Sequence, residues 1–92
     1  MIGSFRDHDT EAIFNGIMVD RFQSIAKTAR RKLREIHRAT GLRDLAMLPG
    51  NRLEAMKGDR AGQHSIRIND RYRVCFIWKD GWALQVEIAD YH

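Results

Sequence analysis

The sequence lacks the features that define several large protein classes. Its single cysteine, Cys75, cannot form an internal disulfide, so packing must stabilise the fold. It has one proline, Pro49, and no linker or repeat. No apolar run approaches the roughly 20 residues of a membrane span, and the first 14 residues carry acids where a secretory signal carries basic and apolar residues. We expect one cytoplasmic domain, residues 1–92, with no membrane partner.

Sites for metals and phosphate-bearing cofactors are also missing from the sequence. The spacing of the four histidines does not match that of metal ligands. They are His8, His37, His64 and His92. The segment GDRAG, residues 58–62, lacks the pattern of a phosphate-binding loop and indicates a turn. We therefore expect neither a metal nor a cofactor, and we interpret Cys75 as a small packed residue.

An excess of positive charge is present instead, with a net charge of +4. Several acids lie within the first 20 residues, and most basic residues lie from Arg21 onward. The most basic segment, KTARRKLREIHR at residues 27–38, holds one acid, Glu35. Such a cluster favours a polyanionic partner, but it is also typical of a solvated face. Charge alone leaves the function open.

Hydrophobic periodicity predicts helices in the first half of the chain. A short strand is expected at residues 1–5 and a brief helix ending at Asn15. The clearest helix follows and stops at Thr40, with one or two helical turns after it at residues 42–48. Its positive side chains should occupy the faces outside an apolar stripe with 3.6-residue spacing. The stripe consists of Phe22, Ile25, Ala26, Ala29, Leu33 and Ile36.

After Pro49 the apolar period becomes two, which predicts strands joined by tight turns. We expect four, at residues 52–56, 64–68, 71–78 and 82–88. Helices followed by a meander predict an α+β fold, with the helices on one face of an antiparallel sheet. The residues expected on that face are Ile66, Ile68, Tyr72, Val74, Phe76, Leu84, Val86 and Ile88. The opposite, basic face should be open to an RNA strand, and it holds Arg67, Arg71, Arg73, Gln85, Glu87 and Tyr91.

This second face carries the candidate chemistry. Arg67 and Arg73 become cross-strand neighbours if residues 69–70 form the hairpin turn. Two adjacent guanidiniums repel each other unless an anion lies between them. Glu54 or Glu87 could supply it structurally, and a phosphate could supply it functionally. The convergence of these charges on one face predicts a site.

A resemblance to a known family runs from Leu48 to His92. The segment reads LPGNRLEAMKGDRAGQHSIRINDRYRVCFIWKDGWALQVEIADYH. It resembles the HigB toxins, also called plasmid-maintenance killer proteins, of the RelE/ParE superfamily. The first 47 residues fit more loosely. The resemblance implies a RelE-like microbial RNase fold, with two N-terminal helices packed on one face of an antiparallel sheet.

The resemblance also implies a function and partners. HigB toxins belong to type II toxin–antitoxin systems and cleave mRNA in the ribosomal A site, which inhibits translation. The expected activity is that of a metal-independent endoribonuclease. Its partners would be the ribosome, mRNA and a HigA-type helix-turn-helix antitoxin. Operator DNA would be met only through that antitoxin.

Residue by residue, the family's terminal motif falls on Asp90, Tyr91 and His92. Its phosphate-contacting basic positions fall on Lys57 and Arg73. The chain therefore places the expected site at the end of its last strand and on the basic face.

The sequence departs from many family members at three positions. Glu54 replaces a His, His64 a Trp, and Tyr72 a Trp. Glu54 also resembles YoeB, another branch of the superfamily, where a Glu–Arg–His set carries out the cleavage. Glu54, Arg73 and His92 supply those residue types in this chain.

Metal-independent cleavage uses the 2′-hydroxyl of the RNA as nucleophile. It needs a base, positive donors for the phosphate and an acid for the departing 5′-oxygen. We assign Glu54 as the base and His92 as the acid, with Asp90 orienting His92. Tyr91 would stack on a nucleobase or hold the substrate. The expected phosphate donors are Arg73, Lys57, Arg67 and Arg60.

Two other functions remain open from the sequence. A ParE-like toxin inhibits gyrase through protein contacts and would not need the Glu–Arg–His set. A non-catalytic nucleic-acid-binding module could use the basic helix alone. Cleavage of a reporter mRNA, with and without an intact His92, distinguishes these functions from an RNase.

Overall fold

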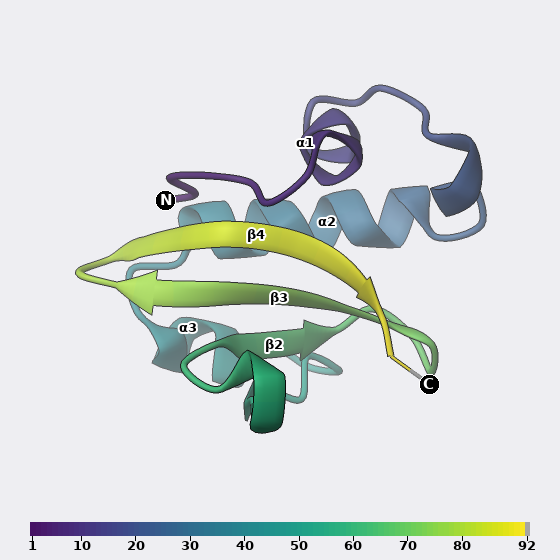
Figure 1. Cartoon of the computed structure of the whole chain (residues 1–92). Helices are drawn as coiled ribbons and strands as arrows, with labels where there is room; N and C mark the ends of the chain where they lie inside the picture. Colours follow the sequence, from purple (N-terminus) through teal and green to yellow (C-terminus); the bar gives the residue numbers. More distant parts are fainter. Residues whose placement is uncertain (92) are drawn as a thin grey trace.

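A computed structural model describes residues 1–91 as helices followed by an antiparallel sheet (Figure 1). The helices are α1 (His8–Phe14), α2 (Ala26–Arg38) and α3 (Leu42–Ala46). The strands are β1 (Glu54–Ala55), β2 (His64–Arg67), β3 (Tyr72–Lys79) and β4 (Trp82–Asp90). Short 3₁₀ turns lie at Asp20–Phe22 and Gly58–Arg60. The expected α+β fold is confirmed.

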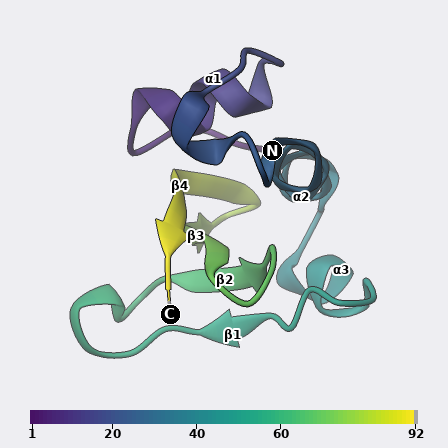
Figure 2. The ribbon, with the colours of Figure 1, turned by 90° about the vertical axis from the view of Figure 1, so that its right-hand side faces the viewer.

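The sheet is a meander in the order β1-β2-β3-β4, each strand antiparallel to the next. Helices α1 and α2 pack against each other and against the two longest strands, β3 and β4. In Figure 2 the helices lie above and to the right of the sheet, and the end of β4 descends toward β1. The sheet therefore has one face covered by helices and one that is open.

Residues 1–5, expected as a first strand, run parallel to β4. They form two isolated bridges, Ile2 with Ala83 and Phe5 with Val86. A side chain at Gly3 would lie 2.8 Å from Leu84 Cδ2, so a glycine allows this close approach. The segment covers the edge of the sheet that β4 would otherwise expose.

The main core lies between the helices and the sheet. The apolar stripe of α2 is buried as expected, with Ala29, Leu33 and Ile36 fully inaccessible. Most sheet residues that were expected to face the helices lie in this core, and Tyr72 packs against its margin. The buried ones are Ile66, Ile68, Val74, Phe76, Val86 and Ile88. These residues fix which sheet face remains for a site.

The prediction that Leu84 faces the helices is wrong. The β3–β4 register shifts between Cys75 and Ile77, and Gln85 adopts a positive φ of 54°. This β-bulge inserts one residue into β4 and reverses the alternation of its side chains before that point. Ala83 consequently takes the buried core position, and Leu84 pairs with Ile77.

The prediction that all positive side chains of α2 lie outside the apolar stripe is wrong for Lys32. This residue is only 5% exposed. It follows Ala29 by three positions and precedes Ile36 by four, so it lies on the same helix face as both. The helix therefore buries one amino group against the segment that leads to β1.

Candidate active site

Arg73 of β3 lies on the open face, where neighbouring groups hold its side chain. It lies opposite Arg67 of β2, which confirms the predicted cross-strand pair. Its Nε donates to Ser65 Oγ at 2.7 Å, and its Nη2 donates to the Arg52 carbonyl at 2.6 Å. The Arg73 side chain is 12% exposed. The guanidinium is thus oriented before any ligand arrives.

Each of the two arginines has an acidic neighbour. Glu54 of β1 places Oε1 3.9 Å from Arg73 Nη2, and its side chain is 60% exposed. Arg67 pairs instead with Asp70 in the hairpin turn. Of the two anions expected for this position, Glu54 is therefore the one beside Arg73, and it lies close enough to share a bound phosphate or hydroxyl.

A hollow of about 310 Å³ lies beside this pair, formed by residues 54–57 and Tyr91. Tyr91 follows β4, and its backbone N–H donates to the Arg71 carbonyl at 2.5 Å. Glu54, Lys57 and Tyr91 therefore meet at one place, although they are distant in sequence. In the sequence, side-chain alternation placed Tyr91 on the same face as Glu54, and the family resemblance added Lys57.

The other predicted site residues lie around this hollow with partners of their own. Asp90 accepts two bonds from Arg71, at 3.0 Å and 2.8 Å, and this carboxylate raises the pKa of the Arg71 guanidinium. Arg60 donates to Glu87 at 2.9 Å and to Gln63 at 3.1 Å. His92, the predicted acid, lies outside the described residues.

Beneath the hollow, Met56, Cys75 and Ala89 form a small apolar cluster. Cys75 is fully buried, as expected for a packed sheet residue. Burial raises the pKa of its thiol above the ordinary value of 9.0. The thiol therefore stays protonated at neutral pH and does not act as a nucleophile.

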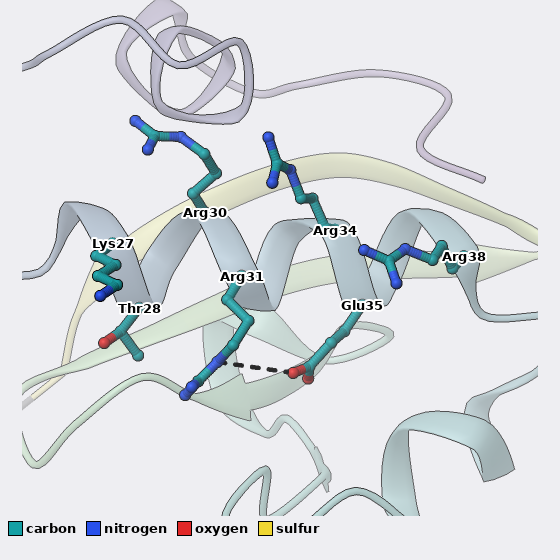
Figure 3. A pocket seen from close by; sticks show the side chains of 7 residues that line it. All are labelled: Lys27, Thr28, Arg30, Arg31, Arg34, Glu35 and Arg38. Carbon is teal, nitrogen blue, oxygen red and sulfur yellow. Dashed lines mark ion pairs between the residues drawn. The ribbon is translucent and has the colours of Figure 1, made fainter.

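A second charged feature lies on α2 (Figure 3). We call it the basic helix surface, a shallow depression of about 640 Å³. It is lined by Lys27, Thr28, Arg30, Arg31, Arg34, Glu35 and Arg38. Arg31 lies 4.0 Å from Glu35, and Arg30 donates to the Ile13 carbonyl at 2.9 Å. Arg34 and Arg38 are exposed.

Within residues 1–91, no group of three or more His, Cys, Asp or Glu side chains is arranged to hold a metal ion. Among the helices of this part of the chain, none is long and apolar enough to cross a membrane.

Comparison with known protein families shows which family the chain belongs to. Residues 4–92 match the family described as "RelE-like toxin of type II toxin-antitoxin system HigB". The chain belongs to this HigB-like family. Toxin HigB-1 of Vibrio cholerae serotype O1 is 44% identical to it over 61 residues, which are 66% of this chain. The chain covers 64% of the length of that relative. The predicted resemblance to HigB toxins is confirmed.

Solved structures show the same fold for this member of the HigB-like family. The YoeB-YefM complex from Staphylococcus aureus contains a chain with a TM-score of 0.61 and 19% identity, and the match covers 100% of this chain and 98% of that one. The YoeB dimer from the same organism gives a TM-score of 0.60 at 20% identity, covering 99% and 97%. At this level of identity, the likeness establishes the fold alone.

Sequence reasoning missed the groups that hold Arg73 in this HigB-like toxin. Ser65 could have been found, because pairing of Arg67 with Arg73 places it diagonally across from Arg73 on the same face. The Arg52 carbonyl could not, because Arg52 has a positive φ of 46°, and no glycine or asparagine at that position signals it.

Proposed function

We propose that this HigB-like toxin is a ribosome-dependent endoribonuclease that cleaves mRNA in the A site and so inhibits translation. The observation that carries the proposal is the anchored Arg73 guanidinium, 3.9 Å from Glu54 at the margin of a hollow. Family membership supports the toxin class. The fixed positive charge beside an exposed carboxylate supports phosphodiester chemistry on this face.

Arg73 is proposed to bind the scissile phosphate. Its Nε and Nη2 are occupied by Ser65 and Arg52, whereas no group within residues 1–91 accepts a hydrogen bond from Nη1. That nitrogen can donate to a phosphate oxygen. A donor held in place by the protein stabilises the charge that builds on phosphorus without reorganising during the reaction.

Glu54 is proposed to take the proton from the 2′-hydroxyl. The 2′-oxygen then attacks phosphorus, the bond from phosphorus to the 5′-oxygen breaks, and a 2′,3′-cyclic phosphate forms. The departing 5′-oxygen receives a proton, which we assign to His92 on the family motif. No metal takes part in this scheme.

The remaining assignments follow the same geometry. Lys57 would add positive charge at the hollow, and Tyr91 would stack on a nucleobase there. Arg67 and Arg60 hold acidic partners, so each would bind phosphate by exchanging that partner. Asp90 is proposed to orient His92.

The proposed partners are the ribosome, mRNA and a HigA-type antitoxin, with operator DNA reached only through the antitoxin. We place the protein in the cytoplasm, where its proposed target lies. The basic helix surface is proposed to dock on ribosomal RNA, because exposed arginines on one helix face bind the phosphate backbone electrostatically.

The test is cleavage of a reporter mRNA in a translating extract, with the cut sites mapped against the ribosomal reading frame. We expect cuts at A-site codons by the wild type and none after deletion of His92, with Lys79→Ala as an exposed, remote control.

Expression alone should arrest growth, and co-expression of the antitoxin should relieve it. Unimpeded growth at good soluble yield contradicts the proposal, and so does a reporter mRNA that remains uncut. Inhibition of gyrase supercoiling would then favour the ParE-like alternative.

A further inference from the structure

A buried polar cluster joins α2 to the segment that precedes β1. Lys32 Nζ donates to Asn51 Oδ1 at 2.5 Å and lies 3.7 Å from Glu35 Oε1. Asn51 Nδ2 donates to Glu35 Oε1 and to the Leu45 carbonyl, each at 3.1 Å. Lys32 is 5% exposed and Asn51 is 0% exposed. Apolar residues often fill such positions with equal or greater stability, so a buried amine that holds an amide and lies near a carboxylate points to a role in fixing geometry.

The backbone of Asn51 is fixed by the same cluster. Its N–H donates to the Leu48 carbonyl at 3.3 Å, and its carbonyl accepts from Arg67 N at 2.6 Å. Asn51 thus connects α2, the end of α3 and β2. The next residue, Arg52, is held at a φ of 46°, a conformation that surrounding structure must enforce in a residue other than glycine.

This strained residue orients the proposed phosphate donor. The Arg52 carbonyl accepts from Arg73 Nη2 at 2.6 Å, and Glu54 follows two residues later, 3.9 Å from the same nitrogen. A shift of the segment from Asn51 to Glu54 therefore moves both groups of the proposed reaction. Lys32 holds the start of that segment from a helix on the other face of the sheet.

We propose that Lys32 and Asn51 are positioning residues for cleavage, which fix the Arg52 carbonyl and, through it, Arg73. This inference rests on the proposed function. Neither residue lines the hollow, so neither should contribute to substrate binding. Because a misplacement of about 1 Å can cost about a hundredfold in rate, we expect losses in kcat rather than in KM.

The experiment compares Lys32→Met and Lys32→Gln with a matched control, Lys79→Met, which removes an exposed lysine at the far end of β3. Met and Gln both have side chains one atom shorter than that of Lys; Met donates no hydrogen bond, whereas Gln keeps an N–H donor. We expect Lys32→Met to lower kcat for mRNA cleavage at least tenfold with KM within twofold. Lys32→Gln should restore part of the rate, and the control should match the wild type.

A second measurement does not depend on cleavage. The Nε–H of Arg73, identified by NMR through its loss in Arg73→Lys, should exchange slowly with solvent in the wild type because it is bonded to Ser65. Loss of the hydrogen bond to the Arg52 carbonyl would loosen the Arg73 guanidinium. The Arg73 Nε–H should therefore exchange at least tenfold faster in Lys32→Met than in the wild type. If the wild-type protein cuts no mRNA, the proposed function fails and this exchange rate alone decides the positioning role.

Folded Lys32→Met protein with kcat and exchange within twofold of wild type would overturn the inference and leave the buried cluster as a stabilising contact only. If Lys32→Met does not fold, Lys32→Gln decides. Its kcat and exchange rate must then differ at least threefold from the wild type, and wild-type values would again overturn the inference.

Discussion

Replacing Arg73 by alanine should have two separable effects, one on stability and one on cleavage. The side chain donates to the fully buried Ser65 hydroxyl at 2.7 Å and to the Arg52 carbonyl at 2.6 Å. A buried hydroxyl that loses its partner costs about 1–3 kcal/mol. For a domain of this size each kcal/mol corresponds to about 4–8 °C, so the melting temperature should fall by roughly 4–24 °C.

The effect on cleavage should be larger than this loss of stability explains. Removing one preorganised donor from a charged transition state costs about 10²–10³ in rate. Cleavage of reporter mRNA should therefore be measured at a low temperature, such as about 15 °C, after circular dichroism has verified that the variant is folded there. Under these conditions the lost rate reports the missing charge, and the melting curve reports the missing hydrogen bonds.

Ser65→Ala is the matched control, because it removes the same 2.7 Å bond from the accepting side and keeps the positive charge. Its melting temperature should fall by a similar amount. Its cleavage should fall by only about tenfold, since the bond to Arg52 still holds Arg73. Equal loss of cleavage in the two variants would refute a direct role for the Arg73 charge. Cleavage by Arg73→Ala within tenfold of the wild type would refute it as well.

Three further predictions concern other residues. Glu54→Gln should lose about 10²–10⁴ in rate, whereas Glu54→His should retain more because imidazole can accept a proton; equal activity of Glu54→Gln and wild type would remove Glu54 from the reaction. Reversing Arg34 and Arg38 to Glu should raise KM and leave kcat unchanged. The slope of log KM against log salt concentration should fall by about one unit per arginine. An unchanged KM with lost antitoxin binding would identify a protein interface instead. The raised pKa of the Cys75 thiol contributes stability that is complete below the ordinary value of 9.0 and is lost as pH rises through the folded pKa. Between pH 8 and 10, wild-type protein should lose more free energy of unfolding than Cys75→Ala, and parallel pH curves would contradict this account.

The features set by local pattern could be predicted from the sequence. The two-residue period after Pro49 and the turn at residues 69–70 fixed the pairing of Arg67 with Arg73. The 3.6-residue stripe located α2 and most of its buried face. Side-chain alternation placed Tyr91 and Glu54 on one face, and the family resemblance added Lys57; all three line the hollow.

The features that escaped prediction depend on tertiary contacts. The bulge at Gln85 reverses which side chains of β4 face the core. No glycine and no break in the hydrophobic pattern indicates it in the sequence. The positive φ of Arg52 occurs directly after Asn51, whose side chain and backbone are hydrogen-bonded to α2, α3 and β2. Lys32 did carry a signal, since its spacing from Ala29 and Ile36 places it inside the stripe, but its charge argued for the outer faces.

The parallel contact between residues 1–5 and β4 constrains how the protein is made. Gln85 N donates to Ser4 Oγ across 81 positions, and Ile88 N donates to Thr10 Oγ1 across 78. Contacts of such high sequence separation form late, because most of the chain must be present before they can close. A nascent chain that has not reached β4 can neither cover this sheet edge nor complete the core around Val86. The complete sheet and its core are therefore acquired only after β4 has been translated.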